Sequence, residues 1–338
     1  MHISTREITL RTLTRGVMLG LIIGASNPAA AQTRWRLTHS VAADRWFDSM
    51  ARLRLSPGGS LAWYGLTRGA VPSWQPDAAR AITLEVLHFA PLYYPSASPS
   101  EFASAIRAGA SGATAPTARA SFLVAVLGAT IVAPTDRALL ASIGAFAESS
   151  ATPTGVSAER LTALQAIWDS VYAPALAPFL RARKLEGGLL MVVPALGPEG
   201  RIFEGRPDDT GDNVIAVTDG ARSTIAEAPL LAAVRELCAS LVTTTLDRVV
   251  ATPGGPKHDA AAATRASVRC GAKLIERSLP SRIERYHLLW SQFGGATSFD
   301  AAFPPLKNVD SAIDVALQEI FARSITSLPL RSKEVVVR

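Results

Sequence analysis

The sequence predicts an α+β protein that is predominantly helical and carries a small sheet. Long Ala- and Leu-rich stretches with helical periodicity fill most of the chain. Two short apolar runs, 189–193 and 213–218, have the length of strands and are joined by a turn-rich loop. The hydrophobic content of 48% and the charged content of 18% are typical of globular proteins and exclude a largely disordered chain.

The N-terminal 31 residues have the pattern of a secretory signal peptide. Arg6, Arg11 and Arg15 precede a short apolar run at 17–25, and an Ala-rich cleavage site ends at Ala31. The run is shorter than the roughly 20 residues that span a bilayer. We therefore expect cleavage after Ala31 and a periplasmic or extracellular protein, with retention of the segment as an N-terminal anchor as the alternative.

Export changes the meaning of the net charge, which is +6 for the whole chain. Cleavage removes three arginines and one glutamate and leaves a net charge of +4. This mild excess gives little reason to expect a nucleic-acid partner. No stretch after the signal peptide has 18 uninterrupted apolar residues, so we expect no stable membrane span in the mature protein.

Residues 32–184 are expected to form a mainly helical N-terminal region. Start signals such as Ser98-Pro99 and Ser157 precede some of its helices. Two Arg-Trp runs, 34–36 and 45–47, are interpreted as parts of packed helices, and a Gly-bounded segment at 60–66 as a strand. The predicted helices are 78–93, 99–108, 117–131, 136–148 and 158–184.

Residues 185–338 are expected to form a C-terminal region with the two strands, and both regions together could make one continuous domain. Glycine and proline clusters separate its helices, and the final segment, 328–338, has no clear pattern. The predicted helices are 228–248, 260–276, 281–292 and 310–325.

The helix that follows the second strand contains the sequence Arg235-Glu236-Leu237-Cys238-Ala239. This order of two strands and a helix with a glutamate resembles a degenerate member of the secreted zincin-like metallopeptidases, over roughly residues 160–280. The resemblance implies a zincin-like core, and in intact members of the family it implies a zinc-dependent peptidase.

The residues at the motif positions do not match a working zinc site. In a His-Glu-x-x-His helix, two histidines hold zinc and the glutamate is the general base. Arg235 and Ala239 stand at the histidine positions, and neither arginine nor alanine can ligate zinc. Glu236 keeps the place of the base, and Glu276 matches the position of a third ligand on a downstream helix. The resemblance therefore implies a vestigial general base at Glu236, vestigial metal positions at Arg235, Ala239 and Glu276, and no cofactor.

Two other interpretations of this helix remain open. An active metal-dependent hydrolase would need an atypical ligand set, such as His258 with Glu236 and Glu276, and would bind zinc. A structural cell-envelope protein would use the helix as an ordinary buried element, since its apolar residues recur at spacings of three and four. An open cleft holding Glu236 and Glu276 would favour the decayed site, whereas an ion pair of Glu236 with Arg235 or Arg277 would favour an architectural role.

The only two cysteines, Cys238 and Cys270, lie on successive predicted helices. Pairing is the default in an oxidising compartment, so we expect a Cys238–Cys270 disulfide that joins the two helices. Two buried thiols are the alternative, whereas a metal pair is disfavoured because neither cysteine has a histidine within four residues.

The remaining patterns favour binding over catalysis. The chain has neither the Gly-x-Ser-x-Gly pattern of a serine hydrolase nor a phosphate-binding P-loop. An acidic loop is most simply a solvated surface, with calcium binding as the alternative. A basic face is likewise most simply solvated, with an acidic partner as the alternative. The loop comprises Glu204, Asp208, Asp209 and Asp212, and the face comprises Lys273, Arg277, Arg282 and Arg285. The expected function is non-catalytic binding of an unidentified protein or peptide.

Overall fold

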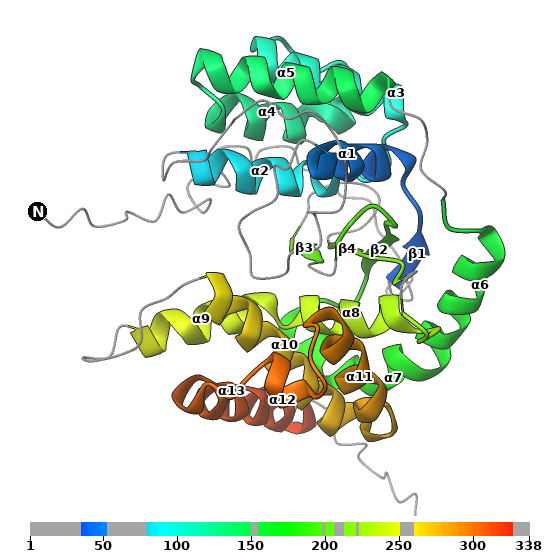
Figure 1. Ribbon diagram of the computed structural model, residues 1–338, viewed down its shortest axis with the longest axis vertical. Helices are drawn as coiled ribbons and strands as arrows, with labels where there is room; N and C mark the ends of the chain where they lie inside the picture. Colours follow the sequence, from blue (N-terminus) through cyan, green and yellow to red (C-terminus); the bar gives the residue numbers. More distant parts are fainter. Residues whose placement is uncertain are drawn as a thin grey trace, which may run out of the picture. The chain divides into compact units, whose positions relative to one another are not determined.

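A four-stranded sheet lies between two layers of helices (Figure 1). The computed structural model describes residues 35–52, 80–149, 155–197, 200–205, 213–220, 223–250 and 260–326. All of these belong to one compact unit. The predicted signal peptide, the strand at 60–66, His258 and the tail after 327 lie outside the described residues.

The sheet is mixed and has the strand order β1-β2-β4-β3. Three strands run parallel, and β3 pairs antiparallel with β4 at one edge. The strands are β1 (Trp35–Thr38), β2 (Gly188–Val192), β3 (Arg201–Phe203) and β4 (Val214–Val217). The two predicted strands are confirmed as β2 and β4, which are neighbours with Leu190 opposite Ile215. The sequence analysis missed β1 and β3, which have only four and three residues.

One face of the sheet is covered by the helices of the N-terminal region. Leu189, Met191 and Val214 point to this face and share a hydrophobic core with the first five helices. These are α1 (Val41–Arg52), α2 (Arg80–Tyr93), α3 (Pro99–Ser111), α4 (Ser121–Thr130) and α5 (Pro134–Ser149). A capping box at Ser98 and Glu101 begins α3, as the sequence indicates.

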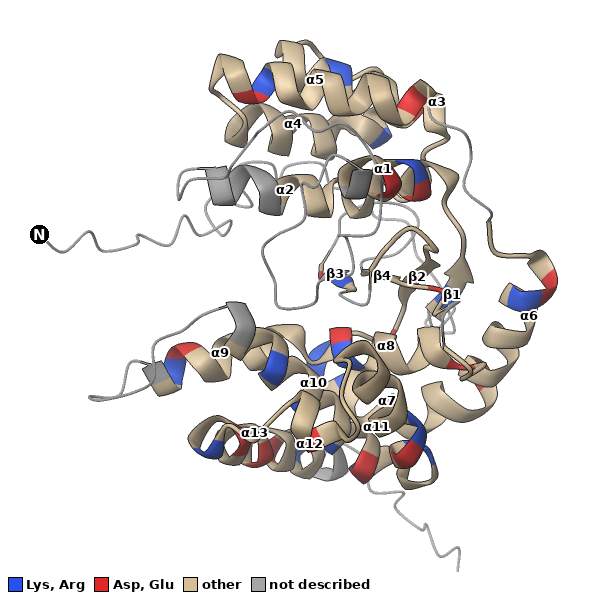
Figure 2. Ribbon diagram, in the orientation of Figure 1, with Lys and Arg blue, Asp and Glu red and all other residues tan. Residues whose placement is uncertain are grey.

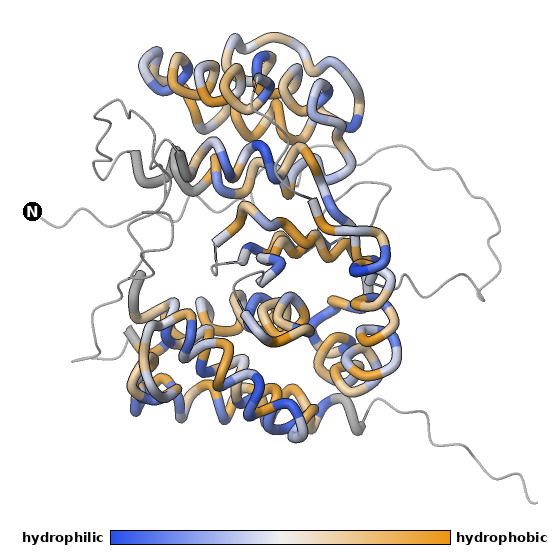
Figure 3. The backbone as a smooth tube through the Cα atoms, turned by 45° about the vertical axis from the view of Figure 1, so that its right-hand side comes forward, coloured by the Kyte–Doolittle hydropathy of each residue, from blue (hydrophilic) through white to orange (hydrophobic). Residues whose placement is uncertain are grey.

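The opposite face packs against the later helices through Leu190, Val192 and Ile215. The alternation of neighbouring residues between two cores follows from the two-residue period of a strand, and Figure 3 shows the strands as apolar along most of their length. The helices of this layer are α6 (Ala158–Ile167), α7 (Ala173–Arg183), α8 (Ala228–Leu237), α9 (Ala239–Val250), α10 (Ala260–Ser278), α11 (Ile283–Phe293), α12 (Phe299–Ala302) and α13 (Lys307–Thr326).

Two long predicted helices are present with local changes. Between α6 and α7 the chain forms a π-helical turn, η4 (Trp168–Tyr172). The predicted helix 228–248 is divided at Cys238. The amide of Cys238 donates to the carbonyl of Arg235, three residues earlier, whereas a regular α-helix would use the carbonyl four residues earlier. Among the described residues one stretch, Ala228–Val249, has the length and composition of a membrane span, and 78% of its most apolar window is buried inside the fold.

The first Arg-Trp run forms a strand, so its interpretation as a packed helix is wrong. Trp35 and Arg36 belong to β1, and the indole of Trp35 donates to the carbonyl of Leu185 at 2.8 Å. The second run, Arg45-Trp46-Phe47, lies in α1 as expected. Because β1 pairs with β2, the two sequence regions on either side of residue 184 contribute strands to the same sheet.

Candidate functional site

The candidate site lies where α8 passes beneath the edge of the sheet. The helix begins at Ala228 after β4 and contacts both β4 and β3. Every residue of α8 is buried, because one side packs on the sheet and the other on α10. Glu236, near the end of this helix, is therefore held inside the fold rather than at a solvated surface.

Glu236 is 4% exposed and forms an ion pair with Arg235, whose guanidinium donates to its carboxylate. The guanidinium carbon of Arg235 also lies 5.6 Å from the ring centre of Trp290. On the other side, a Cβ atom added to Gly200, just before β3, would lie 2.7 Å from Cγ of Glu236. The carboxylate thus fills the space between α8 and the start of β3. Of the two arrangements that the sequence left open, the structure has the ion pair.

The residues at the vestigial metal positions do not assemble a zinc site. The guanidinium of Arg235 is paired with Glu236, the side chain of Ala239 has no atom that could ligate a metal, and Glu276 is exposed on α10. Glu276 acts electrostatically on His287 of α11. Within the described ranges, no group of three or more histidine, cysteine, aspartate or glutamate side chains could hold a metal. These residues do not fit the zinc of an HExxH-type site, and we derive no reaction step through a metal.

Cys238 and Cys270 are buried free thiols, so the predicted disulfide is not present in the structure. The two thiols are unbonded but interact with each other, because α8 packs on α10. Burial raises the pKa of the Cys238 thiol well above its ordinary value, and the adjacent Cys270 raises that pKa further. The protonated, inert form is therefore favoured at neutral pH.

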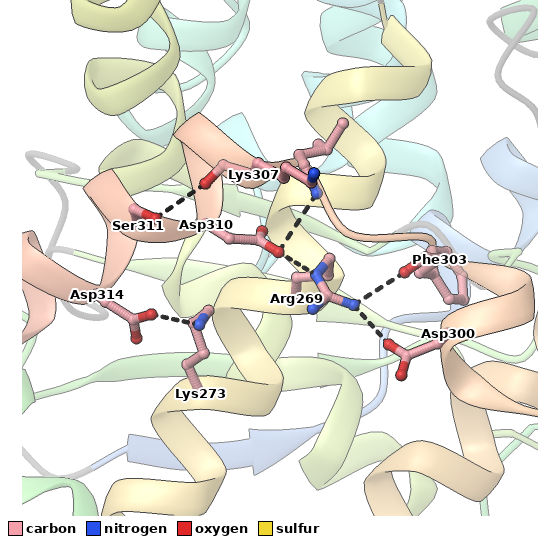
Figure 4. Close-up of polar contacts among 9 residues, drawn as sticks. Arg269, Lys273, Asp300, Phe303, Lys307, Asp310, Ser311 and Asp314 are labelled. Carbon is pink, nitrogen blue, oxygen red and sulfur yellow. Dashed lines mark hydrogen bonds and ion pairs between the residues drawn. The ribbon is translucent and has the colours of Figure 1, made fainter.

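The basic face on the C-terminal helices is largely paired with acidic groups. Lys273 of α10 lies 2.5 Å from Asp314, which also lies 3.5 Å from Arg277, and Figure 4 shows the first of these contacts. Arg282 and Arg285 pair with the buried Glu227. Figure 2 shows the corresponding mixture of charges on these helices. The four cationic side chains thus share two carboxylates, and the remaining positive charge is divided between the Asp314 and Glu227 clusters.

The acidic loop is only partly described. Glu204 accepts a hydrogen bond from Ser240 at 2.7 Å and lies 3.9 Å from Arg183. Asp208, Asp209 and Asp212 lie outside the described residues.

A second buried polar pair was missed in the sequence. His39, which follows β1, is hydrogen-bonded to Asp44 of α1. The other carboxylate oxygen of Asp44 accepts from the amide of Ala195 at 3.2 Å. Burial raises the pKa of Asp44, and His39 opposes that shift. The available signal was a histidine at a strand end five residues before an acid in the first turn of the next helix.

The other two histidines within the described residues have structural positions. His88 is buried in α2, and the ring of His287 stacks on Phe299 with 4.2 Å between ring centres. No protein-family model, curated protein or solved structure matches this chain.

Proposed function

We propose that the protein is an exported, non-catalytic binder of an extended peptide or protein segment, built on a zincin-like core that has lost its metal. The observation that carries this proposal is the edge strand β3, whose outer side pairs with no strand within the described ranges and whose preceding residue, Gly200, lies against Glu236. The carboxylate of Glu236 is neutralised by Arg235 and enclosed in the fold, so it is not accessible as a general base.

The edge strand supplies a surface for a peptide. One side of β3 pairs with β4, and within the described ranges no strand pairs with its other side. The residues of β3 are partly exposed, in contrast to the buried β2 and β4. An extended segment can add to such an edge through main-chain hydrogen bonds, with specificity from alternate side chains.

Metal analysis separates this proposal from an active hydrolase with an atypical ligand set. We expect purified mature protein to contain substoichiometric zinc and to leave an unstructured peptide mixture uncleaved. Stoichiometric zinc that a chelator removes together with peptide cleavage would contradict the proposal.

Binding at β3 is tested with decapeptides selected from a random library on the immobilised protein. Hydrogen exchange should show new protection of amides within 201–203 when a selected peptide binds, and backbone N-methylation of that peptide should abolish binding. The Gly200→Ala change should weaken binding, because its Cβ would lie 2.8 Å from both Cδ of Glu236 and the carbonyl oxygen of Ala216. Gly128→Ala is the matched control, since no atom lies within 4 Å of its added Cβ.

A structural role in the cell envelope is the second candidate, and the buried Arg235–Glu236 pair favours it because an architectural residue needs no access. This role predicts strong self-association in sedimentation and no selected peptide with protection at 201–203. A monomer that binds such a peptide would favour the first candidate.

A further inference from the structure

A surface cavity of about 500 Å³ lies between η4, the segment 224–227 and the turn that leads into α11. Its volume is within the range of roughly 300–1,000 Å³ that is usual for small-molecule sites. Its lining includes Glu227, the residue before α8, but neither Glu236 near the other end of that helix nor any residue of the proposed peptide edge at β3.

The walls of the cavity are apolar. Ile167 and Val171 contribute from α6 and η4, and Ile225 and Leu288 face them from the other elements. The Leu288 side chain is 49% exposed, which is unusual for a large apolar residue in this protein. Val171 lies within the π-helical turn itself, and such turns occur frequently at functional sites.

The polar end of the cavity is built around the buried carboxylate of Glu227, whose side chain is 5% exposed. Arg285 donates to it at 2.6 Å, and Nε of Arg282 lies 3.2 Å from its other oxygen. The hydroxyl of Tyr172 lies beside the same carboxylate, and burial, followed by this negative charge, raises the tyrosine pKa. Glu227 thus holds both arginines in place from the protein side.

The charges at this end are not balanced. Two guanidinium groups face one carboxylate, and the Arg285 side chain remains 54% exposed at the rim. A guanidinium presents donors in a planar fork that matches the two oxygens of a carboxylate. A single excess positive charge beside apolar walls suits a monoanion with an apolar body better than a dianionic phosphate.

We propose that this cavity binds a small organic carboxylate that carries an apolar chain, with its carboxylate on Arg285 and Arg282 and its chain between Val171 and Leu288. The site does not depend on peptide binding at β3, so either proposal can fail alone.

Decanoate is the probe, with binding to the mature protein measured by titration calorimetry. We expect saturable binding of one decanoate per chain. Decanol, which has the same chain and no charge, should bind about tenfold more weakly, which corresponds to about 1.4 kcal/mol. No saturable binding of decanoate, or equal binding of decanol, would overturn the proposal.

Two pairs of variants locate the site. Arg285→Gln should weaken decanoate binding about tenfold, whereas Arg107→Gln should not, although both arginines are ion-paired and about half exposed. Leu288→Asp places a negative charge in the cavity and should abolish decanoate binding. Val315→Asp, at a similarly exposed residue of α13, is its control and should leave decanoate binding unchanged. Equal effects of each variant and its control would contradict the site. If Arg285→Gln unfolds, the Leu288 pair and the decanol comparison decide the outcome.

Discussion

The guanidinium of Arg235 is bonded to the carboxylate of its neighbour Glu236, and both side chains are less than a tenth exposed. The two charges therefore neutralise each other inside the fold. This self-contained pair has consequences for stability that can be measured.

Removing one member of this pair should be costly because the other charge stays buried. We expect Arg235→Met to lower the free energy of unfolding by about 3–5 kcal/mol. Glu236→Gln should lower it by less, because the amide has the same shape as the carboxylate. The double variant should be destabilised by less than the sum of the two. Urea denaturation of all four proteins measures the coupling, and the exposed pair Arg107–Glu148 is the control, with a coupling of about 0–1 kcal/mol. Strictly additive effects at 235 and 236 would contradict a buried ion pair.

Gly271 of α10 lies between the side chain of Tyr286 in α11 and the backbone of Arg235 in α8. A Cβ at this position would lie 2.1 Å from the Tyr286 hydroxyl oxygen and 3.2 Å from Cα of Arg235. Tyr286 cannot move easily, since it is fully buried and donates to the carbonyl of Val268 at 2.9 Å. Gly271→Ala should therefore destabilise the protein by about 1–3 kcal/mol.

The Gly128→Ala change is the control for Gly271→Ala, because both glycines are helical and Gly128 has free space around it. It should stabilise the protein by about 0.5–1 kcal/mol through the higher helix propensity of alanine. Thermal unfolding of the two variants should thus shift in opposite directions. A stable Gly271→Ala protein would mean that α8 and α10 do not pack as described.

Arg269 connects three elements of the C-terminal layer (Figure 4). Its guanidinium donates to Asp310 at 2.6 Å, to Asp300 at 2.8 Å and to the carbonyl of Phe303 at 3.0 Å. Arg269→Lys keeps the charge but loses the planar fork, so we expect it to cost about 1–3 kcal/mol in urea denaturation. Arg323→Ala removes the exposed pair with Glu319 within α13 and should cost no more than about 0.5 kcal/mol. If lysine at 269 is tolerated as well as alanine at 323, the connection is not important for stability.

His287 should make stability depend on pH below its ordinary pKa of 6.5. Burial lowers the pKa of His287 and Arg269 lowers it further, whereas Glu284, Asp300 and Glu276 oppose the shift. The unfolded chain then binds a proton more readily than the folded one, so this contribution is fully present above pH 6.5 and decreases as the pH falls through the lower folded pKa. Unfolding free energies measured between pH 5 and 8 should show this decrease, and His287→Gln should reduce it. An identical pH profile for the variant would refute the assignment.

The two cysteines can be counted chemically. Because Cys238 and Cys270 are buried thiols, a thiol reagent should react with neither in the native protein and with both after unfolding without a reductant. Complete absence of reactive thiols after unfolding would show that the protein carries the disulfide expected from its sequence.

Helix positions followed from the sequence because their signals are local. Ser98 and Ser157 accept hydrogen bonds from amides three residues later, and such caps depend only on neighbouring residues. The strands β2 and β4 were predictable as continuous apolar runs, since both of their faces are buried. In contrast, β1 and β3 are too short for a periodic signal, and they exist as strands because β2 and β4 offer them an edge.

By itself the sequence determined a mainly helical α+β fold and the positions of the two central strands, β2 and β4. Only the tertiary structure decided the state of Glu236, because its burial and its contact with Gly200 arise from the packing of α8 against β3. The cavity at Glu227 is also a tertiary feature, since its arginines and apolar walls come from segments more than 100 residues apart. Local sequence patterns specify helices and strands, whereas the pairing of buried charges and the walls of a cavity depend on which helices and strands pack together.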